Sequence, residues 1–273
     1  MNPLQIKLLE MLAWFHSFCQ EHQLRYYILG GTCLGAKRHK SFIPWDDDVD
    51  IGMPTEDYLK LIALAKKLPQ TPYLLESPTN HEKNFIYTFS KLYDTRTTLI
   101  ENQCPPFKRG IYLDIFPLCG LGNTKKDAQK RLAFISKLRF VLMMRIMEIR
   151  KERKWYKNFL IYLVKKIPSV FLYNYFLKFI HSYMLNYDFN DFNYVGNPVA
   201  TWGIKEIMPR EYFGTPTLYS FANISVYGPE KPDEYLTQLY GNWKQLPPPE
   251  KQKSHHGFLY LNLEKSYLEE NNI

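Results

Sequence analysis

Four acids crowd into residues 46–50, and this run is the feature of the chain most able to do chemistry. Val49 and Ile51 alternate with Asp48 and Asp50. On a strand, the two aspartates would project from one face and the apolar pair from the other. Their like charges would repel strongly at low dielectric unless a cation lay between them. Because hard carboxylate oxygens favour Mg²⁺ or Mn²⁺, the run predicts a divalent-metal site.

A glycine pair lies shortly before the acids. Residues 24–29 form a short β-rich run that ends at Gly30 and Gly31, and residues 32–38 hold helix formers around a single glycine. The predicted order is strand, glycine turn, helix. An acidic strand end beside such a turn indicates a nucleotide or sugar phosphate, because Mg²⁺ borrows ligands from phosphate. The alternative is a solvated acidic turn that faces the basic side chains of residues 37–40.

The elements that must position these residues alternate between strands and helices. Residues 1–23 carry charges and polar breaks within their apolar stretch, which predicts an amphipathic helix and not a secretory signal. Beyond the acids, strands are expected at residues 85–92 and 111–116 and helices at residues 56–67 and 232–240.

Composition restricts the class of protein. A chain of 273 residues with 45% hydrophobic and 23% charged residues can bury a core, which excludes a disordered chain. The four cysteines show neither CxxC nor Cys/His spacing, so no zinc site or disulfide framework is predicted and a reducing compartment fits best. No run of 18 or more residues lacks charge, so no membrane span is expected.

Positive charge is concentrated in one segment. Residues 125–185 hold 15 Lys or Arg against three acids, a net charge of +12, whereas the rest of the chain sums to −4. Large apolar residues occur among these cations at helical spacing, which suits helices lying on an anionic lipid surface. The alternative is a packed helical subdomain with a solvated basic face. A nucleic-acid-binding surface is a third and less favoured alternative, because no RNA-binding signature is present, and no nucleic-acid partner is predicted.

Five segments share the spacing of one family signature. They are GGTCLGAKRHK at 30–40, FIPWDDDVD at 42–50, KLYDTRTT at 91–98, GIYLDIFPL at 110–118 and YGNW at 240–243, with the histidine pair at 255–256 beyond. These motifs closely resemble those of the LicD family of phosphocholine transferases, whose active-site block is also similar to that of the fukutin-type ribitol-phosphate transferases. The resemblance covers roughly residues 24–257. Asn242 departs from it where the family commonly has an acid, and Lys37 stands where a small apolar residue is more usual.

The resemblance implies an α/β (α+β) fold with a nucleotidyltransferase-type mixed sheet and flanking helices. Residues 1–124 would form the catalytic core, and residues 125–190 a basic helical insertion on the membrane and acceptor side. Residues 191–273 would complete the core.

The resemblance also implies which carboxylates bind metal. Asp48 and Asp50 would be the metal pair, Asp46 a supporting or further ligand, and Asp114 a third carboxylate from a later strand. An acid in the middle of IYLDIF would be costly if it were buried without a cation or donors. The alternative for Asp114 is a strand-end aspartate that caps a turn. Asp114 or Asp48 would act as base toward the acceptor hydroxyl.

Phosphate contacts are implied at the glycine turn. Gly30 and Gly31 would let backbone N–H groups approach a diphosphate, and Thr32 would add a hydroxyl at the helix N-terminus. Further nucleotide or phosphate contacts are predicted at Lys37, Arg38, Lys91 and Thr98.

A phosphocholine group would need aromatic faces, because its trimethylammonium has no hydrogen-bond donors. A polyol donor such as CDP-ribitol would instead need polar groups that match its hydroxyls. The candidate contacts for choline or the acceptor are Trp45, Tyr112, Trp202, Tyr240, Trp243, His255 and His256.

The predicted function is a Mg²⁺- or Mn²⁺-dependent phospho-group transferase of the EC 2.7.8 type. It would move phosphocholine from CDP-choline to a sugar hydroxyl of a lipid-linked bacterial surface glycan precursor, a teichoic acid or lipooligosaccharide, and release CMP. It would work in the cytoplasm at the inner face of the plasma membrane. The alternatives are transfer of a ribitol-, glycerol- or sugar-phosphate, and a non-catalytic membrane- or nucleic-acid-binding module on the same fold.

Overall fold

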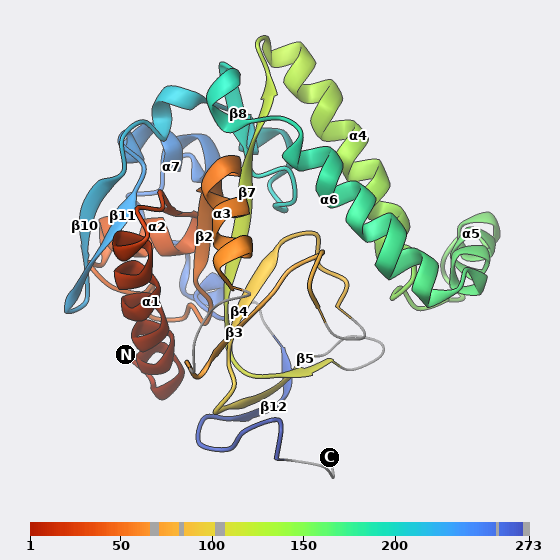
Figure 1. The fold of residues 1–273 in the computed structure, drawn as a ribbon, viewed down its shortest axis with the longest axis horizontal. Coiled ribbons are helices and arrows are strands. Elements are labelled where there is room, and N and C mark those ends of the chain that lie inside the picture. Colours follow the sequence, from red (N-terminus) through yellow and green to blue (C-terminus); the bar gives the residue numbers. More distant parts are fainter. Residues whose placement is uncertain (66–70, 82–84, 102–106, 255–256, 270–273) are drawn as a thin grey trace.

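A mixed β-sheet forms the centre of the molecule (Figure 1). The computed structural model describes residues 1–65, 71–81, 85–101, 107–254 and 257–269. The sheet order is β1-β2-β7-β4-β3, and β8 pairs with both β7 and β9. The β2 and β7 strands are parallel and the other neighbours antiparallel, which confirms the α/β class. The strands are β1 (Tyr27–Ile28), β2 (Asp50–Pro54), β3 (Tyr73–Glu76), β4 (Ser90–Asp94), β7 (Tyr112–Gly122), β8 (Tyr194–Gly196) and β9 (Met208–Pro209).

The β7 strand lies at the centre because it is apolar on both faces. Ten of its 11 residues are buried, and Asp114 is the exception. Strands covered on both faces read as nearly continuous apolar runs, and the sequence of β7 has this character. The position of Asp114 within such a strand therefore requires a local reason, which the candidate site supplies.

Four helices pack around the sheet. The first, α1 (Pro3–Glu21), begins with a capping box in which the Asn2 side chain accepts from the Gln5 backbone N–H at 2.8 Å. Its buried face includes Leu8, Leu12 and Phe15, which confirms the expected amphipathic helix. The other three are α2 (Gly30–Arg38), α3 (Thr55–Ala65) and α7 (Pro232–Tyr240), of which α2 packs on α7 and α3 on β2 and β7.

Two smaller sheets complete the body. A hairpin of β10 (Thr217–Phe221) and β11 (Ile224–Gly228) lies against α1 and α2. A three-stranded sheet has the order β12-β5-β6, with β5 (Thr98–Glu101), β6 (Phe107–Arg109) and β12 (Phe258–Asn262). The late strand β12 thus pairs with β5 from the first half of the chain. The short 3₁₀ turns are η2 (Phe189–Asp191), η3 (Gly203–Glu206), η4 (Arg210–Tyr212) and η5 (Pro249–Lys251).

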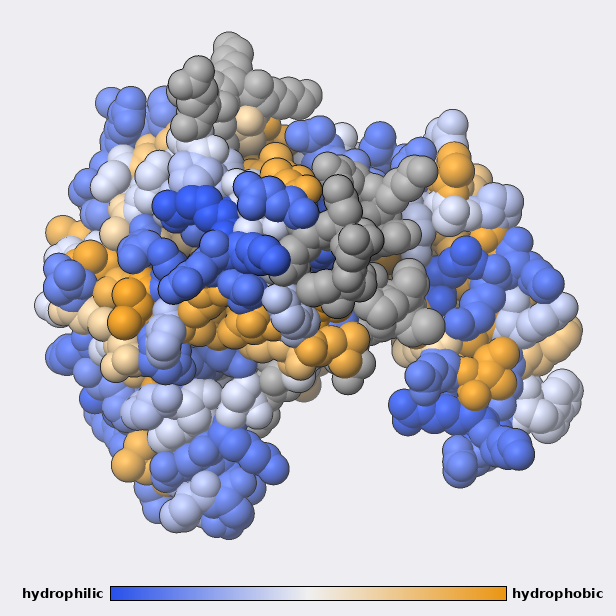
Figure 2. All heavy atoms as spheres, turned by 90° about the horizontal axis from the view of Figure 1, so that it is seen from below, coloured by the Kyte–Doolittle hydropathy of each residue, from blue (hydrophilic) through white to orange (hydrophobic). Residues whose placement is uncertain are grey.

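The basic segment forms a helical arm. We use this name for α4 (Lys125–Met144), α5 (Trp155–Lys166), the π-helical turn η1 (Phe171–Phe176) and α6 (Leu177–Leu185). Figure 1 shows α4 and α6 side by side, with α5 at the end far from the sheet. Seen from below, the end of the arm is a lobe beside the main body with apolar patches among its polar surface (Figure 2).

Two expected elements differ from the observed ones. The strand expected at 85–92 begins only at Ser90, because residues 86–89 turn their side chains into a cavity. Apolar burial there comes from ring contacts, such as Phe89 on Phe116 with centroids 4.4 Å apart, and not from strand pairing. The strand expected at 111–116 continues to Gly122, since the apolar run beyond Phe116 remains between neighbouring strands.

A buried histidine fastens the arm to the sheet. His181 of α6 is 1% exposed, and its Nε2 lies 3.3 Å from the Tyr58 hydroxyl of α3. That hydroxyl in turn lies 2.7 Å from the Ser90 hydroxyl of β4. Burial lowers the pKa of His181 from 6.5 to about 4, so the imidazole is neutral in the folded protein at neutral pH.

Acid should therefore loosen this contact. As pH falls below 6.5, the unfolded chain binds a proton at His181, whereas the folded chain binds it only near pH 4. The unfolded state therefore binds more protons between these two pH values, and the free energy of unfolding falls as pH falls through this window. The His181→Gln variant should lose about 2–3 kcal/mol of this pH dependence in urea unfolding at pH 7 and pH 4.5. Exposed His22→Gln is the matched control, and parallel curves for wild type and His181→Gln would refute the assignment.

Candidate active site

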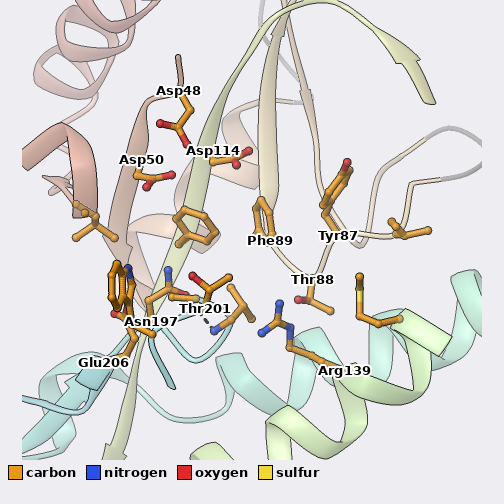
Figure 3. A pocket seen from close by; sticks show the side chains of 18 of the residues that line it. Asp48, Asp50, Tyr87, Thr88, Phe89, Asp114, Arg139, Asn197, Thr201 and Glu206 are labelled. Carbon is orange, nitrogen blue, oxygen red and sulfur yellow. Dashed lines mark hydrogen bonds between the residues drawn. The ribbon is translucent and has the colours of Figure 1, made fainter. Parts of the chain in front are cut away.

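A cavity of about 380 Å³ lies between the sheet and the arm. Its wall combines residues of β2, β7, α4 and α7 with residues 86–89 and 197–202, so segments far apart in sequence meet there (Figure 3). The size is within the range of small-molecule sites. A few polar side chains point into it from an otherwise mostly apolar lining.

Three carboxyl groups share one side of this cavity: Asp48, Asp50 and Asp114 (Figure 3). Asp50 and Asp114 are register partners on the parallel strands β2 and β7, which places their Cα atoms about 4.8 Å apart. The Asp114 backbone N–H donates to the Val49 carbonyl at 3.0 Å and fixes this register. The structure thus brings together the three aspartates that the sequence predicted as metal ligands.

Asp48 does not lie on the strand that the alternating pattern predicted. The β2 strand begins at Asp50, because β1 ends at Ile28 and offers no partner to the preceding residues. Asp48 therefore approaches the site from a loop, which the fully buried side chain of Val49 anchors. A strand would have put both aspartates on one face, whereas the loop lets Asp48 reach the same cavity from a different direction.

Two of these carboxyl groups, those of Asp50 and Asp114, have a raised pKa. Burial is the main cause of the raised pKa of Asp50, and the charges of Asp48 and Asp114 add to it. The pKa of Asp114 rises to about 6, because burial outweighs the opposing effect of the Lys91 ammonium. Such repulsion between buried acids is relieved when a cation binds among them.

This donor set fits a divalent metal ion. Carboxylate oxygens from three positions face one another, and hard oxygens of this kind suit Mg²⁺ or Mn²⁺. In the adjoining loop, one carboxylate oxygen each from Asp46, Asp47 and Asp48 lie within 4.8 Å of one another. Asp46 is thus close to Asp48, where the sequence placed a supporting ligand.

The glycine pair is packed tightly against these acids. A Cβ on Gly30 would lie 3.0 Å from Asp50 Oδ2, and a Cβ on Gly31 would lie 2.6 Å from Asp46 Oδ2. Gly30 also has φ +48°, a conformation that favours glycine. The Gly30 N–H donates to the Tyr235 hydroxyl at 2.9 Å. The glycines therefore admit the carboxylates to the helix N-terminus, and only Gly30 lines the cavity.

Thr32 supports Asp50 from behind. Its hydroxyl is buried and accepts from the Asp50 backbone N–H at 2.9 Å, and it does not line the cavity. The direct phosphate contact of this hydroxyl stays a prediction. Thr32 instead joins the start of α2 to the start of β2.

Lys91 forms an ion pair with one of the acids, Asp114. Its ammonium lies 2.7 Å from Asp114 Oδ1 and 3.3 Å from the centre of the Tyr112 ring, and its side chain is 2% exposed. The Tyr87 ring lies 4.4 Å from the same ammonium. Lys91 thus pairs with the Asp114 carboxylate. The Tyr112 ring, a predicted choline contact, packs against the Lys91 ammonium.

The other predicted phosphate contacts lie elsewhere. Lys37 Nζ pairs with Asp233 at 3.7 Å, and Arg38 donates to the Trp243 carbonyl at 2.9 Å. Thr98 is buried in β5, and its hydroxyl donates to the Lys265 carbonyl at 2.8 Å. None of these three side chains lines the cavity that holds the aspartates.

The predicted aromatic contacts divide between two hollows. Trp202 and Tyr240 line the cavity with the aspartates, and their ring centroids lie 5.0 Å apart at 82°. Trp45 and Trp243 line a neighbouring hollow beside Arg38, which Tyr240 also borders. His255 and His256 lie outside the described residues.

The sequence analysis missed two charged lining residues, Arg139 of α4 and Glu206 of η3 (Figure 3). Burial lowers the pKa of Arg139 to about 10 and raises that of Glu206 to about 8. Arg139 is one of 15 cations in its segment and gave no separate signal. Glu206 gave no clear signal either, because Lys205 precedes it in GIKEIMP, whereas Asp114 stands between apolar residues in IYLDIF.

Comparison with known proteins gives a consistent picture. The family model described as LicD/FKTN/FKRP, nucleotidyltransferase domain, matches residues 23–134. The lipopolysaccharide cholinephosphotransferase LicD of Haemophilus influenzae is 30% identical over 257 residues, which are 92% of this chain and 94% of that protein. Human ribitol 5-phosphate transferase FKRP is 56% identical over 34 residues, 12% of this chain and 7% of its own.

The matched region contains the strand pair β2 and β7, the glycine pair and all three aspartates of the cavity. The similarity to the Haemophilus influenzae protein extends through the arm and the C-terminal part, because it spans nearly the whole of both chains. On this similarity, and with the mixed sheet that the resemblance implied, the chain belongs to the LicD family.

Proposed function

We propose that this protein transfers phosphocholine from CDP-choline to a sugar hydroxyl of a lipid-linked surface glycan precursor and releases CMP. The meeting of Asp48, Asp50 and Asp114 in one cavity with the Trp202 and Tyr240 rings carries the proposal. Full-length similarity to a lipopolysaccharide cholinephosphotransferase supports a lipopolysaccharide-type acceptor, and a teichoic acid is the other acceptor of this chemistry.

The three aspartates would hold Mg²⁺ or Mn²⁺, which would offset charge on the diphosphate of the donor. The chain's own residues position these ligands. Lys91 keeps the Asp114 carboxylate ionised and oriented, since its ammonium lowers a pKa that burial raises. An ionised Asp114 or Asp48 carboxylate would take the proton from the acceptor hydroxyl. The apolar lining limits water, which would compete with the acceptor.

The donor test uses the purified full chain, lipooligosaccharide as acceptor and a panel of CDP-choline, CDP-ribitol and CDP-glycerol. CMP release and choline incorporation should occur with CDP-choline and Mg²⁺ and stop on chelation. Asp50→Asn should lower the rate by roughly a hundredfold or more, because several kcal/mol of charge stabilisation is lost.

Asp191→Asn is the matched control, because Asp191 is an exposed aspartate at the end of η2 and does not line the cavity. Without metal, Asp50→Asn should melt no lower than wild type, since the change removes repulsion between buried acids. Full activity of Asp50→Asn would refute the metal site. Turnover of CDP-ribitol but not CDP-choline would favour the second candidate function, transfer of ribitol phosphate, which the short match to FKRP supports.

Lys91 gives a separate prediction about stability. Lys91→Met should lower the free energy of unfolding by about 3–5 kcal/mol, because it leaves a buried carboxyl without its cation. The double variant Lys91→Met, Asp114→Asn should lose much less than the two single losses summed. Urea unfolding measures both, with Lys60→Met in an exposed pair as the control that should change little. Additive losses would contradict the coupling.

The arm suits binding to the inner leaflet of the membrane. Of the 24 exposed large apolar side chains in the described residues, 14 lie between Phe134 and Phe179. They occur among the 15 cations of the basic segment, a combination typical of helices at an anionic lipid surface. No helix among the described residues combines the length and apolarity needed to cross a bilayer. A lipid-linked acceptor would be presented at that surface.

Flotation with vesicles tests the membrane surface. The protein should float with phosphatidylglycerol-containing vesicles at low salt and less at high salt. Changing exposed Lys151, Lys154 and Lys157 to Gln should weaken binding by about 3 kcal/mol, on the order of a hundredfold. Leu259→Ser, distant from the arm, should leave flotation unchanged. Salt-insensitive binding or none would favour the packed-subdomain interpretation.

A further inference from the structure

One acid of the cavity has no partner. Glu206 ends η3, is 6% exposed and lines the cavity on a different side from the three aspartates (Figure 3). Within the part of the chain that the structure describes, its carboxyl makes no hydrogen bond and no ion pair, and its oxygens are not among the fully enclosed atoms without a partner. A mostly buried acid that lines a cavity without a protein partner is open to a ligand there, so it requires a functional or structural explanation.

Two aromatic rings form a corner in the same cavity. Trp202 and Tyr240 meet edge to face at 5.0 Å, and both line the cavity with Glu206. The neighbouring wall is made by Val199 and Ala200, whose side chains donate no hydrogen bonds. Lys205 also approaches the Trp202 ring, at 5.2 Å, but it does not line the cavity and donates to the Leu239 carbonyl.

Tyr240 connects this corner to the aspartates. A Cβ atom placed on Gly30 would lie 3.6 Å from the Tyr240 hydroxyl and 3.0 Å from Asp50 Oδ2, so both oxygens border the same small space beside Gly30. The raised pKa of the Tyr240 phenol has burial as its main cause, and both Asp50 and Glu206 add to the rise. A group bound at the aspartates and extending along Tyr240 would therefore meet the corner and the Glu206 carboxyl.

We propose that Glu206, Trp202 and Tyr240 form the subsite for the quaternary ammonium of the transferred group, an inference that rests on the proposed phosphocholine transfer. A trimethylammonium offers no donor and spreads its charge over methyl groups, so it favours aromatic faces and a nearby carboxylate. Burial holds the Glu206 carboxyl largely protonated at neutral pH. When the cation binds, the carboxyl ionises and its proton passes to solvent.

The subsite distinguishes among the aromatic residues near the matching motifs. Trp45 and Trp243 border a different hollow, and Tyr112 already faces the Lys91 ammonium at 3.3 Å. Of the aromatic residues predicted to contact choline or the acceptor and described by the structure, Trp202 and Tyr240 share their cavity with both the aspartates and Glu206. Glu206 therefore determines preference for a cationic alcohol over a neutral one.

Calorimetry with two ligands tests this assignment. One is phosphocholine and the other is the same phosphate ester with a tert-butyl group in place of the trimethylammonium. Wild type should bind the cation about tenfold tighter or more than the neutral isostere. Glu206→Gln should reduce this ratio to about threefold, the aromatic contribution. Trp202→Leu should weaken phosphocholine binding, and exposed Glu234→Gln should match wild type.

Turnover separates the inference from the function on which it rests. Glu206→Gln should raise KM for CDP-choline with kcat nearly unchanged. A Glu206→Gln variant that keeps the wild-type binding ratio would overturn the subsite. Loss of kcat for CDP-choline and CDP-glycerol alike would also overturn it, because Glu206 would then act at the reacting phosphate. Failure of wild type to use CDP-choline would instead refute the proposed function.

Discussion

The placement of like charges side by side on two parallel strands is the constraint on which the site depends. Asp50 and Asp114 are register partners at the point where β2 meets β7, and burial raises the pKa of both. Neighbouring residues position these carboxyl groups and offset part of the cost of burying them. The Thr32 hydroxyl holds the start of β2, the glycine pair makes room for carboxylates, and Lys91 offsets part of the charge. A divalent ion would relieve the remainder.

The helical arm joins two parts of the proposed reaction. Its α4 helix lines the cavity with Arg139 and Met143, while the outer faces of α4 and α5 expose apolar and basic side chains. His181 of α6 fastens the same arm to α3 and β4 through Tyr58. The arm therefore lines a cavity suited to a nucleotide donor on one side and exposes a surface suited to lipid on the other. This arrangement suits an acceptor that is itself anchored in lipid.

Sequence patterns were reliable where apolar residues alone decide the structure. The helix at 232–240 and the amphipathic first helix appear as expected, because the proline at the start of the former, the capping box of the latter and the apolar spacing of both are local properties. The strand expected at 85–92 is mostly absent, because its alternation reflects ring packing around a cavity. The acidic run predicted a strand that starts too early, since the partner strand β1 ends at Ile28. The alternation of residues along one strand does not show where the neighbouring strand ends.

The sequence by itself determined the class of fold and picked out the three carboxylates that line the cavity, Asp48, Asp50 and Asp114. An acid beside apolar residues is costly to bury without a cation or hydrogen-bond donors, whatever the rest of the chain does. The sequence also determined the family, through motifs around the glycine pair and the acids. Only the tertiary structure decided which predicted contacts share a cavity: it brought Trp202 and Tyr240 to the aspartates and placed Thr98 and Lys37 elsewhere. It also added Arg139 and Glu206, whose roles depend on neighbours from other segments. Proximity between distant segments follows from packing, and one sequence does not record it.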